Sequence, residues 1–396
     1  MRLGNGGVLG LLAVAGSWGL FWGGWAPLIP QIKSDLDLSD QQLGLALFAV
    51  PVGAVPAMLL TGRLARRLGH RVLPAVTALF AGSVLVVGLA PDRWTFTAAL
   101  LLVGATSGGI EVALNATTAA HEARDGSRLF NKVHAVTPLV MVLAAPAVGL
   151  GRELGASKLT VLTLIALLVA ASAALAIDPR GWQEPAEQHP ARRPAQARGP
   201  RLLTGPLLLV GIVGAAVLFM ENAVEQWGAI LLEEELGTGP LLASLGPAAY
   251  MAGLSGGRML AQWRGARLGD RSLATLGGTL GGLGIAVAAL ADTAWLALAG
   301  FAVAGIGLAP VLPTLLGAAG RAAGPGQRAT AVSAVTTASY AGFLSSPPLV
   351  GTLAGWLSLP TALGLVALGG LLVIAGSRAN RLLDPRASES RTGALV

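Results

Sequence analysis

The sequence contains no cysteine, which excludes disulfide bonds, thiolate metal ligands and cysteine nucleophiles. Charged residues are also scarce, at 12% of the 396 residues, against 54% hydrophobic residues. Lysine occurs only at Lys33, Lys132 and Lys158, and none of these follows the glycines of a phosphate-binding Walker A loop. If the protein performs work, we therefore expect the energy to come from an ion gradient or from a separate subunit.

Apolar segments take the place of the missing charges. The chain has 55 glycines and a mean hydropathy of +0.68. Apolar runs of about 20 residues recur from end to end, and this length crosses a bilayer as a helix. Only helices and closed barrels satisfy their backbone groups inside a bilayer, and these runs are too continuous for the alternation of a barrel strand. The sequence predicts an all-α integral membrane protein.

Twelve transmembrane helices fit the apolar runs. In the first half, the predicted spans lie near residues 7–29, 41–61, 72–90, 95–119, 132–151 and 159–177. In the second half, they lie near residues 204–231, 241–262, 273–291, 295–319, 329–352 and 359–377. The first run is too long for the apolar core of a signal peptide, so we interpret it as a retained helix.

One long polar segment divides the chain. Residues 178–201 contain five prolines and five arginines and cannot bury a core, so we interpret them as a cytoplasmic linker. The predicted domains are an N-terminal six-helix bundle at 1–177, a C-terminal six-helix bundle at 202–378 and a cytoplasmic tail at 379–396.

The net charge of +7 does not indicate a nucleic-acid partner, because the basic residues are sorted by topology. Only four of the 27 lysines and arginines fall on one predicted side of the membrane. By the positive-inside rule, the other side is the cytoplasm. An even number of spans then places both termini there. The four exceptions are Lys33, Arg93, Arg152 and Lys158.

The stretch from Gly104 to Asn115 carries an acidic residue, Glu111, inside an apolar run. A charged residue at the centre of a membrane helix costs roughly 2.5–3.5 kcal/mol on insertion scales, and such residues are usually functional. A desolvated carboxyl group can exchange protons near neutral pH, so we predict that Glu111 binds a proton. Asn115 lies one turn along the same face and is either a substrate ligand or the hydrogen-bond partner of Glu111. Gly104, Gly108 and Gly109 should admit a neighbouring helix.

The two halves carry related patterns between their second and third spans. Gly62-Arg63-Leu64-Ala65-Arg66-Arg67-Leu68-Gly69-His70-Arg71 joins the spans of the first half, and Gly257-Arg258-Met259-Leu260 with Arg267-Leu268-Gly269 lies at the corresponding place in the second. These patterns resemble the loop motif of the major facilitator superfamily. That resemblance implies two pseudo-symmetric six-helix bundles around a site near the bilayer midplane. The acidic residue with which the family latches one conformation is replaced here by Arg66 and by Gln262.

The resemblance implies a gating role for the loop and its surroundings. The residues assigned to conformational gating are Gly62, Arg63, Arg66, Arg67, Gly69, Arg71, His134 and Arg258. His134 is either a proton relay or a wetted residue where its helix begins. Arg258 is expected to extend to the cytoplasmic interface. Pro310 and Pro313 are expected to permit a kink in the tenth span, and Pro347 and Pro348 one in the eleventh.

Glu111 followed by Asn115 in the fourth span resembles the fucose-permease-like branch of the superfamily, in which this acidic residue is tied to proton coupling. Further stretches resemble uncharacterised bacterial relatives of that branch. They are Phe21 to Pro27 (FWGGWAP), Asn131 to His134 (NKVH), Glu221 to Trp227 (ENAVEQW), Gly342 to Leu344 and Pro347-Pro348. The resemblance implies a multi-pass protein of the bacterial cytoplasmic (inner) membrane, surrounded by lipid and working as a monomer.

Aromatic and acidic residues supply the candidate substrate ligands. Trp18, Trp22 and Trp25 share one face of the first span and either contact a sugar-like ligand or serve ordinary packing. For Trp25 the alternative is an interfacial anchor, the role we also assign to Trp94, Trp295 and Trp356. The residues assigned to substrate binding are Asn115, Trp22, Trp18, Glu221, Asn222 and Glu225.

These observations predict a secondary active transporter that takes up a small polar, sugar-like solute together with protons by alternating access. Its partners are the solute and protons, with no cofactor and no metal. One alternative is proton-driven efflux of an amphipathic compound or drug. A membrane-embedded transferase is the alternative of another class, but four scattered histidines and no cysteine disfavour an enzyme.

Overall fold

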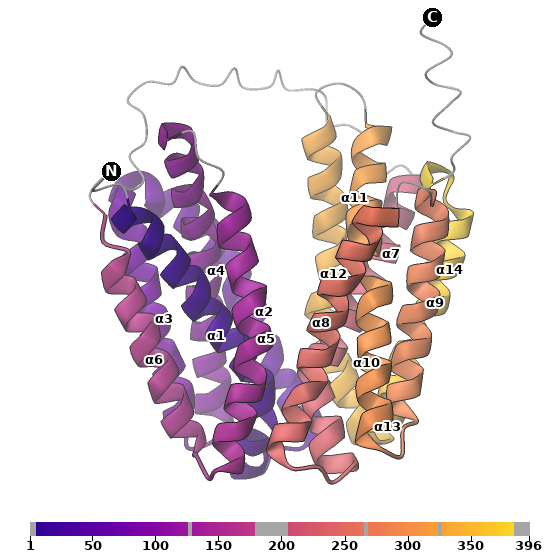
Figure 1. Cartoon of the computed structure of the whole chain (residues 1–396), viewed down its shortest axis with the longest axis horizontal. Coiled ribbons are helices and arrows are strands. Elements are labelled where there is room, and N and C mark those ends of the chain that lie inside the picture. Colours follow the sequence, from indigo (N-terminus) through magenta and orange to yellow (C-terminus); the bar gives the residue numbers. More distant parts are fainter. Residues whose placement is uncertain (1–4, 126–128, 179–204, 265–267, 324–326, 384–396) are drawn as a thin grey trace, which may run out of the picture. The chain divides into compact units, whose positions relative to one another are not determined.

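A computed structural model describes residues 5–125, 129–178, 205–264, 268–323 and 327–383 (Figure 1). Every regular element in this part of the chain is a helix. Most of the predicted linker and of the predicted tail lies outside the described residues, so the predicted domain boundaries stay a prediction. The contacts divide the chain into two compact units. The N-terminal unit contains α1 to α6, and the C-terminal unit contains α7, α9 to α14 and α8 from Leu245 onward.

Six long helices form the N-terminal unit. They are α1 (Asn5–Asp35), α2 (Asp40–Leu68), α3 (Val72–Leu89), α4 (Arg93–Asp125), α5 (Phe130–Glu153) and α6 (Lys158–Leu175), with the short helix η1 (Gly69–Arg71) between α2 and α3. Serine side chains fix two of the starts: Ser39 accepts a hydrogen bond from the Gln42 backbone at α2, and Ser157 accepts one from Thr160 at α6.

The C-terminal unit repeats this plan with two interrupted helices. Its elements are α7 (Gly205–Ile230), η2 (Leu231–Glu235), α8 (Pro240–Arg264), α9 (Asp270–Ala289), α10 (Ala294–Leu308), α11 (Val311–Ala322), α12 (Arg328–Trp356), α13 (Leu359–Ala367), α14 (Gly369–Ala379) and η4 (Arg381–Leu383). The tenth span breaks between α10 and α11, with Pro310 at the N-cap of α11, which confirms the predicted kink. Pro347 and Pro348 remain inside the continuous helix α12.

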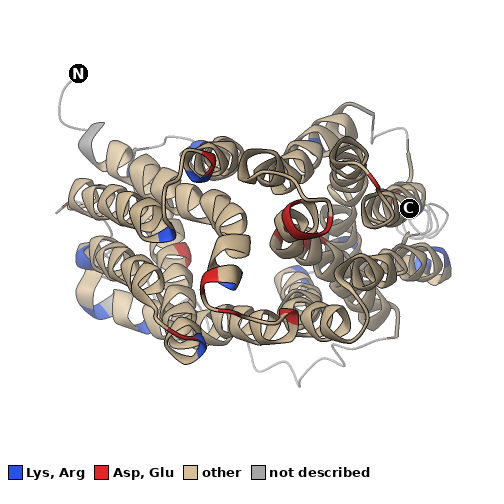
Figure 2. Ribbon diagram, turned by 90° about the horizontal axis from the view of Figure 1, so that it is seen from below, with Lys and Arg blue, Asp and Glu red and all other residues tan. Residues whose placement is uncertain are grey.

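The described helices account for the twelve predicted spans. Ten stretches are long and apolar enough to cross a membrane. The other two predicted spans correspond to α8 and α12, which are more polar but have 25 and 29 residues. A span needs about 20 residues, so both are long enough to cross. Few positions along any of the helices are charged (Figure 2).

The same pairs of helices pack together in each unit. In the N-terminal unit, α1 packs along α5, α2 along α4, and α3 along α6. In the C-terminal unit, α7 packs along α12 and α9 along α14, while glycines of α8 and α10 bring these two helices into contact. The second unit therefore repeats the pairing of the first, as the predicted pseudo-symmetry requires.

Glycine sets the closest approach between α2 and α4. A Cβ atom at Gly104 would overlap the backbone of Val50, and one at Gly108 would lie 2.9 Å from the carbonyl oxygen of Ala54. These two positions confirm that the glycines beside Glu111 admit a neighbouring helix. Gly53 of α2 repeats the pattern against Leu101, so the approach is made from both helices.

The four basic residues on the predicted charge-poor side have local partners. Their contacts are Lys33 Nζ to Asp40 Oδ1 at 2.6 Å, Lys158 Nζ to Asp35 Oδ2 at 3.2 Å, Arg152 to the carbonyl oxygen of Pro27 at 2.7 Å, and the guanidinium of Arg93 at 4.7 Å from the centre of the Trp94 ring. These contacts tie together the loops at one end of the N-terminal unit.

Candidate functional site

Three polar side chains lie along one face of α4. Ser107, Glu111 and Asn115 follow one another at four-residue steps, so the helix places them one turn apart. Ser107 is buried, whereas Glu111 and Asn115 are half-buried. Helices α1 and α5 both contact α4. The face therefore lies within reach of side chains from two other helices of the N-terminal unit.

Two tryptophans of α1 meet on the hydroxyl group of Ser107. The indole Nε1 of Trp18 donates to Ser107 Oγ at 2.8 Å, and that of Trp22 donates to the same oxygen at 3.2 Å. A hydroxyl oxygen has two lone pairs and can accept both bonds. The contact fixes both half-buried indoles against α4, one turn before Glu111. The sequence analysis missed Ser107, although its position four residues before Glu111 was a usable signal.

His134 joins the beginning of α5 to the same face of α4. Its Nε2 lies 3.1 Å from Asn115 Oδ1, and its ring stacks on Phe130 with 5.6 Å between ring centres. Because the amide oxygen accepts, Nε2 carries the hydrogen in this arrangement. Asn115 therefore bonds to His134 and not to Glu111. Glu111 itself forms no hydrogen bond with a described residue, but His134 interacts with it electrostatically.

Trp25 does not anchor the helix at the membrane interface. Only 2% of its surface is exposed, and its ring stacks with Phe21 at 5.7 Å and with Phe96 at 6.4 Å between centres. The interpretation of Trp25 as an anchor is wrong, because packing between α1 and α4 buries it. The three other tryptophans assigned to the interface, Trp94, Trp295 and Trp356, are more than two-thirds exposed, at 70%, 71% and 73%.

The C-terminal unit brings a second group of polar side chains together. Glu221 and Glu225 are half-buried on one face of α7, and Asn222 between them is buried. Tyr250 of α8 is fully buried and interacts electrostatically with both carboxyl groups. Arg258, two turns further along α8, interacts with them as well. Arg258 is exposed and also interacts with the two carboxyl groups, so we count it as a member of this group. The sequence analysis did not identify Tyr250.

The predicted gating loop of the first half is short. Helix α2 continues to Leu68, and Gly69 then turns the chain into η1 with a φ of 52°. Such a positive φ favours glycine. The side chains of Arg63, Arg67 and Arg71 are exposed and form no ion pair with the described residues, while the side chain of Arg66 lies outside them.

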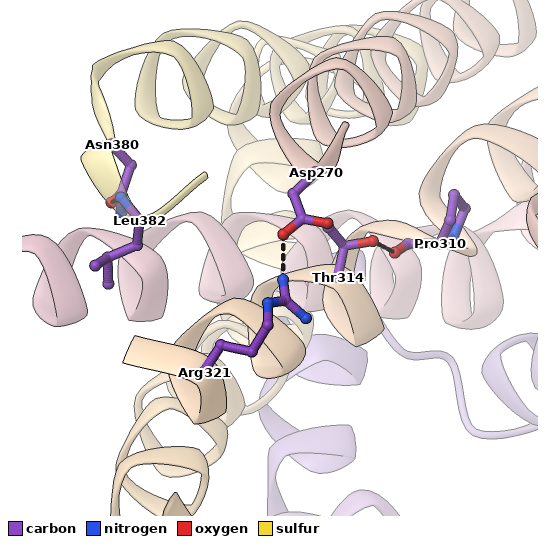
Figure 3. A network of polar contacts seen from close by, with 6 residues as sticks. All are labelled: Asp270, Pro310, Thr314, Arg321, Asn380 and Leu382. Carbon is purple, nitrogen blue, oxygen red and sulfur yellow. Dashed lines mark hydrogen bonds and ion pairs between the residues drawn. The ribbon is translucent and has the colours of Figure 1, made fainter. Parts of the chain in front are cut away.

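The equivalent end of the C-terminal unit is tied by polar contacts (Figure 3). Asp270, the first residue of α9, forms an ion pair with Arg321 near the end of α11. Arg271 donates to the carbonyl oxygen of Asn380 at 3.3 Å, and Asn380 Nδ2 donates to the carbonyl oxygen of Pro206 at 2.9 Å. These bonds join α9 to α11, to the end of α14 and to the beginning of α7. They were not predicted from the sequence.

Comparison with known sequences and structures agrees with this architecture. The sequence profile of the Major Facilitator Superfamily matches residues 8–246 and 212–394. The chain belongs to the major facilitator superfamily. The sequence is 32% identical over 375 residues to an uncharacterized MFS-type transporter of Yersinia pestis, covering 91% of this chain and 92% of the relative. It is 27% identical to the membrane protein MosC of Rhizobium meliloti, covering 91% of this chain and 86% of the relative.

Solved structures of other transporters share the fold at low sequence identity. A mutant of the nucleoside transporter NupG has a TM-score of 0.79 at 14% identity, covering 94% of this chain and 99% of the other. A bacterial homologue of the human lysosomal transporter Spinster has a TM-score of 0.76 at 14% identity, covering 95% and 97%. This MFS-type chain is therefore a multi-pass membrane transporter with a small-molecule substrate. Its fold is the predicted one, twelve helices in two pseudo-symmetric six-helix bundles.

Proposed function

We propose that this protein takes up a small polar, sugar-like solute together with protons, and that Glu111 carries the coupled proton. The observation that supports this most is the arrangement of α4, where Glu111 lies one turn from Asn115 while His134 hydrogen-bonds Asn115 and interacts with Glu111. An ionisable side chain within a span costs free energy, and the residues of this kind that occur in spans are usually functional. Here the acid, a titratable imidazole and an amide lie within one small group.

The proton step follows from the charges of this group. Ionised Glu111 leaves a negative charge inside the bundle, and its protonation removes that charge and permits the occluded state to form. His134 is held by its bond to Asn115 and interacts with Glu111, so its imidazole ring is suited to pass protons to and from this acid. Release of the proton to the cytoplasm, the side on which we place both termini, then resets the carrier.

The two indoles supply the binding surface in this proposal. Because Ser107 accepts from both Nε1 atoms, Trp18 and Trp22 offer a solute their ring faces instead of their donors. Aromatic faces commonly line ligand pockets and suit the apolar face of a sugar ring. Asn115 is the proposed ligand for the hydroxyl groups of the solute, and Glu221, Asn222 and Glu225 of α7 are the further residues to which we assign substrate binding. We place the protein in the bacterial inner membrane as a monomer.

Flux into proteoliposomes tests the proposal. The full-length protein is reconstituted with a pH-sensitive dye in the lumen, and sugars, sugar acids and amino sugars are added outside, with and without an imposed pH gradient. We expect a solute that accumulates with the gradient and carries protons inward, and we expect Glu111→Gln to abolish accumulation but retain solute exchange. Glu235→Gln, at an exposed carboxyl group beyond α7, is the matched control. Efflux against the proton flow, or gradient-driven uptake by Glu111→Gln, contradicts the proposal.

A further inference from the structure

The acidic group of the C-terminal unit combines two carboxyl groups with one guanidinium group. Glu221 and Glu225 follow each other at four residues along α7, so their carboxyl groups share one face. Arg258 is the positive side chain that interacts with both of them. With all three ionised, the group carries one negative charge. Neither carboxylate forms an ion pair or a hydrogen bond with a residue that the structure describes.

Two fully buried oxygen atoms of α7 and α8 also have no hydrogen-bond partner in the described chain. The hydroxyl group of Tyr250 is one of them: this residue is 0% exposed and interacts electrostatically with Glu221 and Glu225. Oδ1 of Asn222 is the other: this residue is 1% exposed and lies on α7 between the two acids. A buried polar atom without a partner costs free energy. The group is therefore incomplete as it stands.

We infer that this group binds a protonated amine of the transported solute. An alkylammonium group has three N–H donors, no acceptor and one positive charge. The carboxylates of Glu221 and Glu225 and Oδ1 of Asn222 supply acceptors, and the single negative charge left by Arg258 matches the charge of the ligand. Tyr250 can accept a fourth hydrogen bond from the ligand or donate its own hydrogen to a carboxylate. The inference rests on the proposed function, because it assigns a substrate class to the solute: an amine-bearing polar compound such as an amino sugar.

A neutral hydroxyl group in the place of the amine fits this group less well. A hydroxyl group donates one hydrogen bond, carries no charge and leaves acceptors without a partner. Sites built around buried polar groups reject analogues that leave these groups unpaired. An N-acetylated amine is larger, neutral and has a single N–H, so it is rejected for the same reason.

Ligand-dependent thermal unfolding of the purified full-length protein tests the inference with three matched probes: glucosamine, glucose and N-acetylglucosamine. We expect glucosamine to give half-maximal stabilisation at a concentration about tenfold lower than the two neutral sugars, in line with the strength of hydrogen bonds to charged groups. Glu225→Gln should bring the three concentrations together, whereas Glu235→Gln, at an exposed carboxyl group, should keep the preference.

A second variant separates binding from folding. Tyr250→Phe removes a hydroxyl group that has no partner among the described residues, so the ligand-free protein should unfold at an unchanged or higher temperature. The affinity for glucosamine should nevertheless fall several-fold, which a purely structural role for Tyr250 does not predict. Equal effects of the three sugars, including no effect of any, overturn the inference. So does an amine preference that survives in Glu225→Gln.

The two proposals fail in distinguishable ways. The binding measurement uses no proton gradient, and Glu111→Gln should retain the preference for glucosamine because Glu111 belongs to the other unit. If the amine preference is found but uptake ignores the pH gradient, proton coupling is wrong and the amine site stands. If neutral and amine sugars bind alike while uptake follows the gradient, only the amine site is wrong.

Discussion

Nε2 of His134 lies 3.1 Å from Oδ1 of Asn115, although 19 residues separate the two along the chain. The bond joins the beginning of α5 to the helix that carries Glu111. It also orients the imidazole ring, which interacts electrostatically with Glu111. His134 is exposed near the beginning of α5, as one interpretation of the sequence expected, but its bond to Asn115 also ties it to the helix that carries Glu111. The predictions below begin with this pair.

Replacing His134 with alanine should slow gradient-driven uptake by about tenfold, the factor that corresponds to the loss of a hydrogen bond of about 1.4 kcal/mol. Solute exchange without a gradient should change little, because exchange does not require proton release. The measurement is the initial rate of uptake into proteoliposomes with and without a pH gradient. Asn131→Ala, at an exposed position near the beginning of α5, is the control. Equal slowing of uptake and exchange would argue for a structural role.

The bond itself can be measured with a double-mutant cycle. We expect Asn115→Ala and His134→Ala to show a coupling free energy of about 0.5–1.5 kcal/mol, the usual net contribution of a hydrogen bond. Reversible unfolding in mixed detergent supplies the four free energies. A cycle between His134 and Ser255 should show no coupling, because the Ser255 hydroxyl group bonds, among the described residues, only to the Met251 carbonyl oxygen of its own helix. Additive effects of Asn115→Ala and His134→Ala would contradict the contact.

Ser107→Ala should free two indole donors at once. Loss of a shared acceptor leaves Trp18 and Trp22 unsatisfied, so the unfolding free energy should fall by about 1–3 kcal/mol. Tryptophan emission should also change, because both Nε1–H groups lose a hydrogen bond. Ser255→Ala should alter neither property. An unchanged emission spectrum in Ser107→Ala would show that the serine does not hold the two rings.

Gly104→Ala should be strongly destabilising, because the added methyl group overlaps the backbone of Val50 in α2. Overpacking of this kind typically costs about 1–3 kcal/mol, and backbone cannot move aside as a side chain can. Gly82→Ala in α3 is the matched control, since no described atom beyond the neighbouring stretch of its own helix lies within 4 Å of its Cβ position. It should be neutral or slightly stabilising because alanine favours a helix. The measurement is the midpoint of thermal unfolding of the two purified variants. Equal midpoints would contradict the close packing of α2 and α4.

The ion pair between Asp270 and Arg321 should contribute little to stability, since 37% and 60% of the two side chains are exposed. Exposed pairs are worth about 0–1 kcal/mol, so Arg321→Gln should shift the unfolding midpoint only slightly. We expect a larger effect on transport rate if the pair helps to hold one conformation. The charge swap of both residues should restore the rate, and Arg328→Gln, at an exposed arginine that begins α12, should leave it unchanged. Failure of the swap to restore the rate would exclude a role for the pair itself.

Local periodicity made a large part of the protein predictable from its sequence. Hydropathy gave the spans, because a helix in lipid must be long and apolar whatever surrounds it. Glu111 and Asn115 fall on one face because four residues complete about one helical turn. The glycines before them predicted the approach of a neighbouring helix, and Pro310 predicted the break in the tenth span. Each of these inferences needs only one segment of chain.

Contacts between helices could not be read in this way, because they depend on how each helix is rotated and how deeply it is inserted against its neighbour. Trp25 belongs to the same sequence face as Trp18 and Trp22, yet packing of α1 against α4 buries it against Phe96, while the other two reach Ser107. The bond between His134 and Asn115 and the interaction of Tyr250 with Glu221 likewise depend on how neighbouring helices pack. The sequence by itself determined which helices exist and which polar residues share a face. The tertiary structure decided which of those faces meet. The reason is that a glycine permits close approach, but the rotation of its helix is fixed only by the contacts made with the neighbouring helix.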